Sequence, residues 1–368
     1  MQRNRDQAIV LVATILAIAT PAFSNDVNTI VGTGAQGFSG DNGPALAATI
    51  QDPRGIAVAN DGSIYFADSG NFRIRKVTPG GIISTIVGNG IEQYAGDDGP
   101  GTAASISGLL SIALNPANDR LYIADLGNNV IRVLDLGTGI ITRFAGISPL
   151  DFGDQGNDVP ALTASLGFPE GVAVGPDGTV YIADTLDCEI RSVDTSGIIH
   201  LIGGDPFACD GAGEGVNVST ATFSLPARLA TNAAGDLFVV DTGIKTIRKI
   251  DHATHIITTV AGGGSTPPGF GLATDMNLGD VTDAASDTLN HLYITAQHRV
   301  FRLDLSSGFL SVFAGTGVPG FSGDGGPADA AQFNNVFGVG VRGDAVIISD
   351  GDNARLRSVA PPPPCRAI

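Results

Sequence analysis

The sequence contains no tryptophan and only two methionines, five tyrosines and three cysteines among its 368 residues. Basic residues are also scarce: 20 lysines and arginines face 37 acidic residues, for a formal net charge of −17. So acidic a surface repels phosphate backbones and anionic lipid headgroups, which argues against nucleic acid and acidic membranes as partners. In contrast, glycine occurs 51 times and proline 20 times. Both residues break helices, so the composition indicates short strands joined by turns.

The first 24 residues have the pattern of a secretory signal peptide. Arg3 and Arg5 precede the apolar run "AIVLVATILAIA", and the small residues of "AFS" at 22–24 suit a peptidase that cuts before Asn25. A membrane anchor is the alternative, but this run is short for a bilayer span. No later segment has 18 uncharged apolar residues, so we expect no membrane span after cleavage. The predicted mature protein is secreted or periplasmic and monomeric.

Six copies of one strand pattern follow. The final residues of these strands stand 57, 59, 57, 55 and 54 positions apart, as seen in "IYFAD" (64–68), "LYIAD" (121–125), "VYIAD" (180–184), "LFVVD" (237–241), "LYITA" (292–296) and "VIISD" (346–350). A similar strand precedes each copy, and two more follow it, the last ending in a glycine signature such as "IVGNG". Four antiparallel strands repeated six times predict an all-β, six-bladed β-propeller.

The ends of the chain predict how the ring closes. The last repeat stops after its third strand, because the proline-rich residues 361–368 cannot supply a fourth. The N-terminal segment "NTIVGTG" (28–34) has the fourth-strand signature with no blade before it. We therefore expect it to complete blade six, which gives a propeller of residues 25–360 and a tail of 361–368.

A segment of twelve residues occurs twice. "GFSGDNGPALAA" (37–48) and "GFSGDGGPADAA" (320–331) are identical at ten positions and lie 283 residues apart, or five repeat periods. Both connect a fourth strand to the next blade. Their "DxGPA" core predicts a tight glycine turn followed by a helical turn that a proline begins.

The segment "PRGIAVANDGSIYFADSGNFRIRKV" (53–77) and its five relatives resemble the NHL repeat. The resemblance covers residues 28 to 359 and implies a six-bladed propeller, most often a scaffold that binds proteins or other ligands. Related propellers include peptidyl-hydroxyglycine lyases, lactonases and virginiamycin lyase, so the resemblance leaves an enzyme open.

Two columns of charged residues are expected to hold the fold. An aspartate ends the second strand in five repeats, with Ala296 as the exception, and an arginine is found in all six third strands. In a β-hairpin these two positions lie diagonally across from each other on one face. The columns are Asp68, Asp125, Asp184, Asp241 and Asp350, and Arg75, Arg132, Arg191, Arg248, Arg302 and Arg357. Blade five should be the least regular.

The residues just before the innermost strands should surround the mouth of the central channel. Those that could hold a ligand there are Arg54, Glu170, Asp280 and Phe337. No nucleophile–base pair and no three-ligand metal set converges at these positions, so the sequence assigns no catalytic residue, metal or cofactor. The five histidines fall elsewhere; His252 and His255 have a spacing that a metal could use, but no matching ligands. The "GDNG" and "GDGG" turns lack the spaced carboxylates of a calcium loop.

Two of the three cysteines are expected to pair. Cys188 falls in a hairpin of blade three and Cys209 in the connection to blade four, and these loops leave the same face of a propeller. An exported protein would form this disulfide, whereas Cys365 in the tail would stay unpaired.

The sequence favours an exported binding scaffold whose contact surface is formed by the long loops between blades, at about 35–53, 91–109, 147–168, 205–225, 265–279 and 318–335. A channel-site enzyme, such as a lyase or lactone hydrolase, is the first alternative. A structural component of an envelope or matrix is the second, and it would self-associate.

Overall fold

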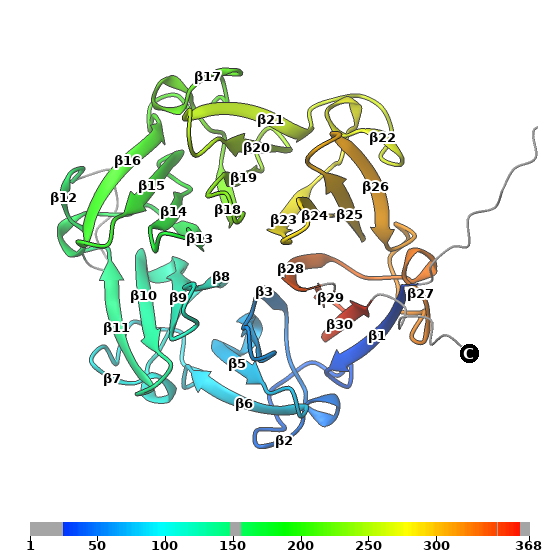
Figure 1. Cartoon of the computed structure of the whole chain (residues 1–368). Helices are drawn as coiled ribbons and strands as arrows, with labels where there is room; N and C mark the ends of the chain where they lie inside the picture. The colour runs from blue at the N-terminus through cyan, green and yellow to red at the C-terminus, as the bar shows by residue number, and fades with distance from the viewer. Residues whose placement is uncertain (1–24, 148–155, 344, 361–368) are drawn as a thin grey trace, which may run out of the picture.

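The computed structural model of the protein describes residues 25–147, 156–343 and 345–360. The predicted signal peptide (1–24) and tail (361–368, with Cys365) lie outside the described residues. Six antiparallel sheets stand in a ring around a central axis, as Figure 1 shows. The chain is therefore the six-bladed β-propeller that the repeats predict.

Each blade has four main strands, numbered here from the axis outward. Blade one contains β3 (Pro53–Val58), β4 (Ile64–Asp68), β5 (Arg73–Val77) and β6 (Ile82–Val87). Blades two and three contain β8 (Leu109–Leu114), β9 (Arg120–Asp125), β10 (Val130–Asp135) and β11 (Ile140–Ala145), and β13 (Pro169–Val174), β14 (Val180–Asp184), β15 (Glu189–Val193) and β16 (Ile198–Gly204).

Blades four to six repeat this order. They contain β18 (Pro226–Thr231), β19 (Leu237–Asp241), β20 (Thr246–Ile250) and β21 (Ile256–Gly262); β23 (Val281–Ser286), β24 (His291–Ala296), β25 (Arg299–Asp304) and β26 (Phe309–Ala314); and β28 (Val336–Arg342), β29 (Ala345–Asp350), β30 (Arg355–Ala360) and β1 (Asp26–Val31).

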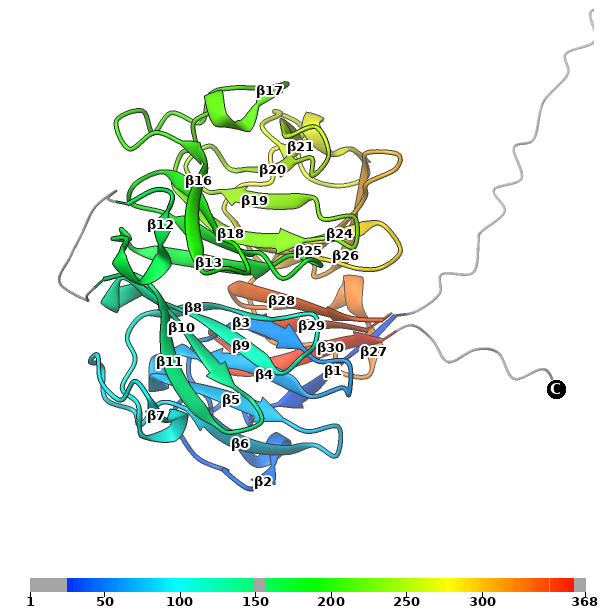
Figure 2. The ribbon, with the colours of Figure 1, turned by 60° about the vertical axis from the view of Figure 1, so that its left-hand side comes forward.

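The N-terminal strand closes the ring in the predicted way. β1 pairs with β30 in antiparallel register, from Asp26 opposite Ala360 to Val31 opposite Leu356. The two strands, blue and red, lie next to each other in Figures 1 and 2. First and last segments of the chain thus share one sheet, so the closure depends on ladder hydrogen bonds and leaves neither strand as an open edge there.

Every blade also carries a fifth, two-residue strand that the sequence did not predict. It comes from the connection between blades and pairs with the fourth strand at the outer rim (Figure 1). These short strands are β2 (Gly43–Pro44), β7 (Gly99–Pro100), β12 (Val159–Pro160), β17 (Val216–Asn217), β22 (Gly271–Leu272) and β27 (Gly326–Pro327). A two-residue bridge is too short to leave a periodic signal, which is why four strands per blade were expected.

The repeated twelve-residue segment explains this rim. Gly40 turns the chain at φ 87°, where a Cβ atom would lie 2.7 Å from Ala48 Cα, so glycine is required. Pro44 then precedes the 3₁₀ turn η1 (Ala45–Ala47), as the "DxGPA" core predicts. Ala45, Ala48 and Ile50 are buried between blades six and one. The second half of the connection is therefore a wedge that seals two blades together.

The hydrophobic core is divided into six clusters, each between two neighbouring blades. Each cluster contains apolar residues of the wedge, as in Ala104 and Ile106 for blades one and two. Phe333 fills the same place between blades five and six. The wedges thus join the blades into one structure, while the first half of each connection lies outside these clusters.

Candidate functional site

The two charged columns meet inside the blades as buried ion pairs. In blade one the Arg75 guanidinium lies 3.1 Å from the Asp68 carboxylate, and both side chains are inaccessible to solvent. The equivalent distances in blades two, three, four and six are 3.6, 3.5, 3.7 and 3.6 Å. Asp68 also accepts hydrogen bonds from the backbone N–H of Gln51, at 2.7 Å, and from the Asn71 side chain, at 2.8 Å. These contacts tie the second and third strands to the start of the innermost strand.

The repeated connection supplies a second acceptor for the arginine. Asp41, from the "GFSGD" segment, lies 2.9 Å from Arg75, and Asp324 lies 2.7 Å from Arg357. Asp97 does the same for Arg132 at 2.6 Å. We call the second-strand aspartate, the third-strand arginine and this loop acceptor the charge cluster of a blade. The aspartate–arginine contacts of this cluster are buried, which supports a structural role, whereas the loop acceptors Asp41, Asp97 and Asp324 are partly exposed.

Blade five lacks all three members of the charge cluster. Ala296 stands where the other blades have aspartate, and Gly269 stands where blade one has Asp41. Phe301 pairs with Ile294 as Arg75 pairs with Phe66, so a phenylalanine replaces the arginine. Arg302 pairs with Tyr293 and faces solvent. Its assignment to the arginine column was therefore wrong by one residue. The hairpin of blade five is shorter than the others, so an alignment by spacing matched Arg302 to the column that Phe301 occupies.

Burial controls the acidity of the second-strand aspartates. It raises the pKa of Asp125 to about 7, although hydrogen bonds from the Ser107 N–H and the charge of Arg132 act in the opposite direction. Burial likewise raises the pKa of Asp241 to about 7 and that of Asp350 to about 6. Removing a carboxylate from water costs free energy, which the nearby arginine and N–H donors offset only in part.

The residues predicted for the channel mouth are only partly together. Arg54 lies over the Phe337 ring, 4.4 Å from its centre, and forms an ion pair with Asp52 at 2.9 Å. Asp280 points elsewhere: its side chain is 80% exposed and lies 2.8 Å from Lys245. The position equivalent to Arg54 in blade five is Thr282, since Val281 pairs with Ala296 as Pro53 pairs with Asp68. The irregular spacing of blade five therefore explains why Asp280, and not Thr282, was assigned to the channel mouth.

Glu170 contacts a buried arginine that the sequence analysis did not single out. Arg228 lies 3.5 Å from the Glu170 carboxylate and donates to the Glu170 carbonyl at 3.0 Å. Its Nε has no hydrogen-bond partner in the described part of the chain, and burial lowers the pKa of its guanidinium. Arg228 occupies an innermost-strand column in which blades one, three and six have glycine. A charged residue in a glycine column was the signal that could have revealed it.

Asp283 stands in the same column of blade five. Its two carboxylate oxygens accept the N–H groups of Ala284, at 2.9 Å, and of Val339 in blade six, at 3.0 Å. Burial raises its pKa to about 6, and Arg228 opposes this rise. Asp283 lines a cavity of about 220 Å³ among the innermost strands, together with Ser111 and Thr231. The polar groups of the channel therefore mainly bond one blade to the next.

Among residues 25–147, 156–343 and 345–360, no three His, Cys, Asp or Glu side chains form a group that could hold a metal ion. The same part of the chain contains no helix long and apolar enough to cross a membrane.

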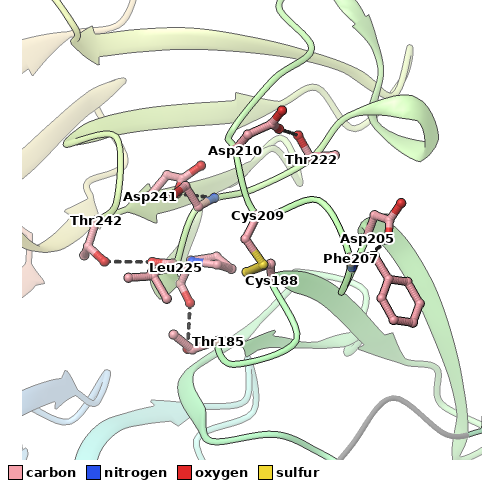
Figure 3. The surroundings of a disulfide bond; sticks show 12 residues. Thr185, Cys188, Asp205, Phe207, Cys209, Asp210, Thr222, Leu225, Asp241 and Thr242 are labelled. Carbon is pink, nitrogen blue, oxygen red and sulfur yellow. Dashed lines mark hydrogen bonds between the residues drawn. A yellow bond between two sulfur atoms is a disulfide. The ribbon is translucent and has the colours of Figure 1, made fainter.

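Cys188 and Cys209 form the expected disulfide, with 5.5 Å between their Cα atoms. Figure 3 shows the bond joining the β14–β15 hairpin to the loop that carries Phe207. Disulfides form mainly in oxidising compartments and are rare in the cytosol, so this bond indicates an oxidising compartment.

The first halves of the connections between blades expose large apolar side chains. Phe207 is 97% exposed and Phe270 is 80% exposed, and Ile91 and Val318 on two further connections are more than half exposed. Residues 148–155, in the connection to blade three, lie outside the described residues. Exposed aromatic side chains on loops set on a rigid scaffold are typical of contact surfaces.

Comparisons with known proteins agree with the repeats. A family model described as the teneurin NHL domain matches residues 7–93 and 140–205. Teneurin-4 of Mus musculus is 34% identical over 235 residues, which cover 57% of this chain and 8% of that protein. Teneurin-1 of Homo sapiens is 27% identical over 310 residues, which cover 76% of this chain and 10% of that protein. The chain thus spans about a tenth of the length of these relatives.

Solved structures show the same architecture at low identity. A structural genomics protein of unknown function from Bacteroides thetaiotaomicron superposes with a TM-score of 0.66 at 16% identity, covering 91% of this chain and 75% of that one. A gluconolactonase from Xanthomonas campestris superposes with a TM-score of 0.54 at 14% identity, covering 86% and 89%. Identities this low show the fold alone. The six repeats, the ring of six sheets and the teneurin NHL match together support an NHL-repeat six-bladed β-propeller.

Proposed function

We propose that this NHL-repeat propeller is exported and acts as a scaffold that binds another protein through the exposed first halves of the connections between its blades. The observation that carries the proposal is the exposure of Phe207, Phe270, Ile91 and Val318 on four of these connections. Exposing such side chains costs solvation free energy in the free protein, which contact with a partner would recover.

The disulfide and the N-terminal pattern support export. The Cys188–Cys209 bond indicates an oxidising compartment, and the first 24 residues have the pattern of a signal peptide. N-terminal sequencing of the protein from its native source tests this part. A mature chain that begins at Asn25 supports export, whereas an intact Met1 in a cytoplasmic fraction would contradict it.

Partner capture tests the binding role. The mature protein, fitted with a photocrosslinker, is compared with the variant Ile91→Ser/Phe207→Ser/Phe270→Ser/Val318→Ser on proteins secreted by its native cells. We expect the variant to lose at least one specific crosslinked protein. Leu289→Ser is the matched control, because Leu289 is also exposed but lies in a β23–β24 turn. Equal capture by all three proteins would overturn the proposal.

A channel-site enzyme is the second candidate. The observation that favours it is the Nε of buried Arg228, which has no hydrogen-bond partner among the described residues and whose neighbour in the chain, Leu229, lines the cavity of about 220 Å³ together with Asp283. A guanidinium there could stabilise negative charge that develops on a substrate oxygen. A panel of lactones offered to the mature protein and to Arg228→Met tests it, with circular dichroism to verify folding. Turnover by the wild type alone would support this candidate.

A further inference from the structure

One region of the propeller face combines exposure with backbone strain. Phe168 and Leu225 each immediately precede the first strand of a blade, at φ 52° and 59°, in the left-handed region. The equivalent residues of blades one, two and six are Asp52, Gly108 and Asn335, which tolerate this conformation. A bulky apolar residue there is strained, and yet these two side chains remain 40% and 48% exposed. Strain without full burial points to a use outside the fold.

Contacts between loops bring further apolar side chains to the same region. The Leu186 N–H donates to the carbonyl of Gly167, next to Phe168, at 2.9 Å. Thr185 donates to the carbonyl of Pro226, next to Leu225, at 2.7 Å. Leu186 is 54% exposed. These bonds bring the loop ends that carry Phe168, Leu186 and Leu225 to one region of the surface, and we call these three exposed residues the blade 3–4 patch.

The disulfide extends this patch to Phe207. Cys188 is two residues from Leu186, and its bond to Cys209 fixes the neighbouring loop. Figure 3 shows the disulfide between Leu225 on one side and Phe207 on the other. Fixing the loop in advance lowers the entropy that a partner must remove on binding.

The charges around the blade 3–4 patch indicate what it binds. Asp205 and Asp210 are exposed on the disulfide-bonded loop, and Asp280 lies beyond the β19–β20 hairpin, where Lys245 is the neighbouring cation. The chain as a whole carries a formal net charge of −17. Two copies of so acidic a rim would repel each other, whereas lysine and arginine on a different protein would be attracted.

We propose that the blade 3–4 patch docks a different protein through an apolar segment flanked by lysine or arginine. This inference rests on the proposed scaffold function and extends its contact surface from Phe207 to the neighbouring loop ends of blades three and four. Phe168 and Leu225 would enter apolar pockets of the partner, and the acidic rim would orient its basic residues.

Stability separates this role from a packing role. In Phe168→Asn/Leu225→Asn, relief of the left-handed strain offsets the lost partial burial, so we expect the melting temperature to change by no more than about 2 °C. A fall of more than about 5 °C would show that these side chains hold the fold, and would overturn the inference.

Binding is tested with three synthetic peptides as probes, by fluorescence anisotropy on the mature protein. The first combines Leu and Phe with Lys, the second replaces Lys by Glu, and the third replaces Leu and Phe by Ser. Only the first should bind, and its affinity should fall about tenfold or more in Phe168→Asn/Leu225→Asn but not in the control Leu289→Ser. Equal binding of the first peptide by both variants would overturn the inference.

Two further outcomes distinguish this inference from its alternatives. If sedimentation shows that the wild type dimerises and that Phe168→Asn/Leu225→Asn does not, a second copy occupies the patch and the inference is wrong. If the four-residue loop variant loses partner capture while Phe168→Asn/Leu225→Asn keeps it, the scaffold function stands and only the blade 3–4 patch is wrong. Loss of capture in both variants supports both the scaffold function and the blade 3–4 patch.

Discussion

Blade five differs from the other five blades in what fills the space between its second and third strands and the loop that enters the blade: it has apolar residues where the others have a buried ion pair. Blade two buries Arg132 between Asp125 and Asp97, whereas blade five has Phe301, Ala296 and Gly269 at these positions. Phe301 packs with Met276 and Leu278 of its own wedge in an apolar cluster. The aspartate and the arginine are replaced together, which teaches that the buried pair behaves as a unit: a buried charge without its partner costs more than an apolar replacement of both.

Removing one member of the cluster should have the largest effect. Arg132→Met leaves the fully buried Asp125 without its cation, so we expect a loss of about 3 to 5 kcal/mol in the free energy of unfolding. Urea titration of the mature protein measures it. Arg302→Met makes the same chemical change on the exposed face of blade five and should cost less than about 0.5 kcal/mol. Similar losses in both variants would break the comparison.

Blade four provides an intermediate case. Glu214 stands at the position of the loop acceptor but accepts a hydrogen bond from the Thr259 hydroxyl, at 2.9 Å. Arg248 instead donates to the carbonyl of Gly213, at 2.7 Å. The disulfide anchors this loop in place of an aspartate–arginine contact.

Loss of that anchor should show in both stability and dynamics. Cys188→Ser/Cys209→Ser should lower the free energy of unfolding by about 3 kcal/mol. Hydrogen exchange should speed up in residues 205–213 and stay unchanged in residues 37–48. Reduced wild type is the matched control and should behave like the double variant; faster exchange in both loops would show that the bond acts on the whole ring.

The loop acceptor alone should contribute less. Asp97→Asn keeps a hydrogen-bond acceptor near Arg132 but removes the charge, and Asp97 is partly exposed, so we expect a loss of about 1 kcal/mol. Gly269→Asp places the same group in blade five, where no arginine receives it and nothing lies within 4 Å of a Cβ. Thermal unfolding should show no stabilisation by Gly269→Asp; a rise in melting temperature would contradict the assignment of Phe301 to the arginine column.

A further prediction concerns pH. Burial raises the folded-state pKa of Asp125 and Asp241 from 3.8 to about 7. Between pH about 4 and about 7 the folded protein therefore binds more protons than the unfolded chain, and its stability should decrease as pH rises through this window. Melting curves at pH 5 and pH 7.5 measure the decrease, which Asp125→Asn should reduce. A melting temperature that rises between these values would contradict the direction.

Much of the fold was predictable because a propeller repeats its packing. Six copies of a strand pattern and a displaced fourth strand at residues 28–34 were sufficient to predict the ring and its closure. The predicted disulfide needed only the rule for which loops share a face. The two-residue strands at the rim were missed because such short pairing leaves no periodicity.

The candidate site was less predictable, and the errors gather in blade five. Arg302 and Asp280 were assigned by spacing, but the shortened hairpin and the loss of the charge cluster shift the register there. Arg228 and Asp283 were missed because each is a single charged residue in an inner strand. Only the strand register shows that both occupy the position where blades one, three and six have glycine. The strain at Phe168 and Leu225 depends on φ angles that no sequence pattern specifies.

A double-mutant cycle in blade two tests the central claim most directly. Asp125→Ala, Arg132→Phe and the combined variant convert this cluster to the chemistry of blade five, and urea unfolding gives the free energy of each. We predict that the combined variant is more stable than Arg132→Phe alone, with a coupling energy of about 2 kcal/mol or more between the two positions. Additive losses would contradict the account, because the aspartate and the arginine would then stabilise the blade independently.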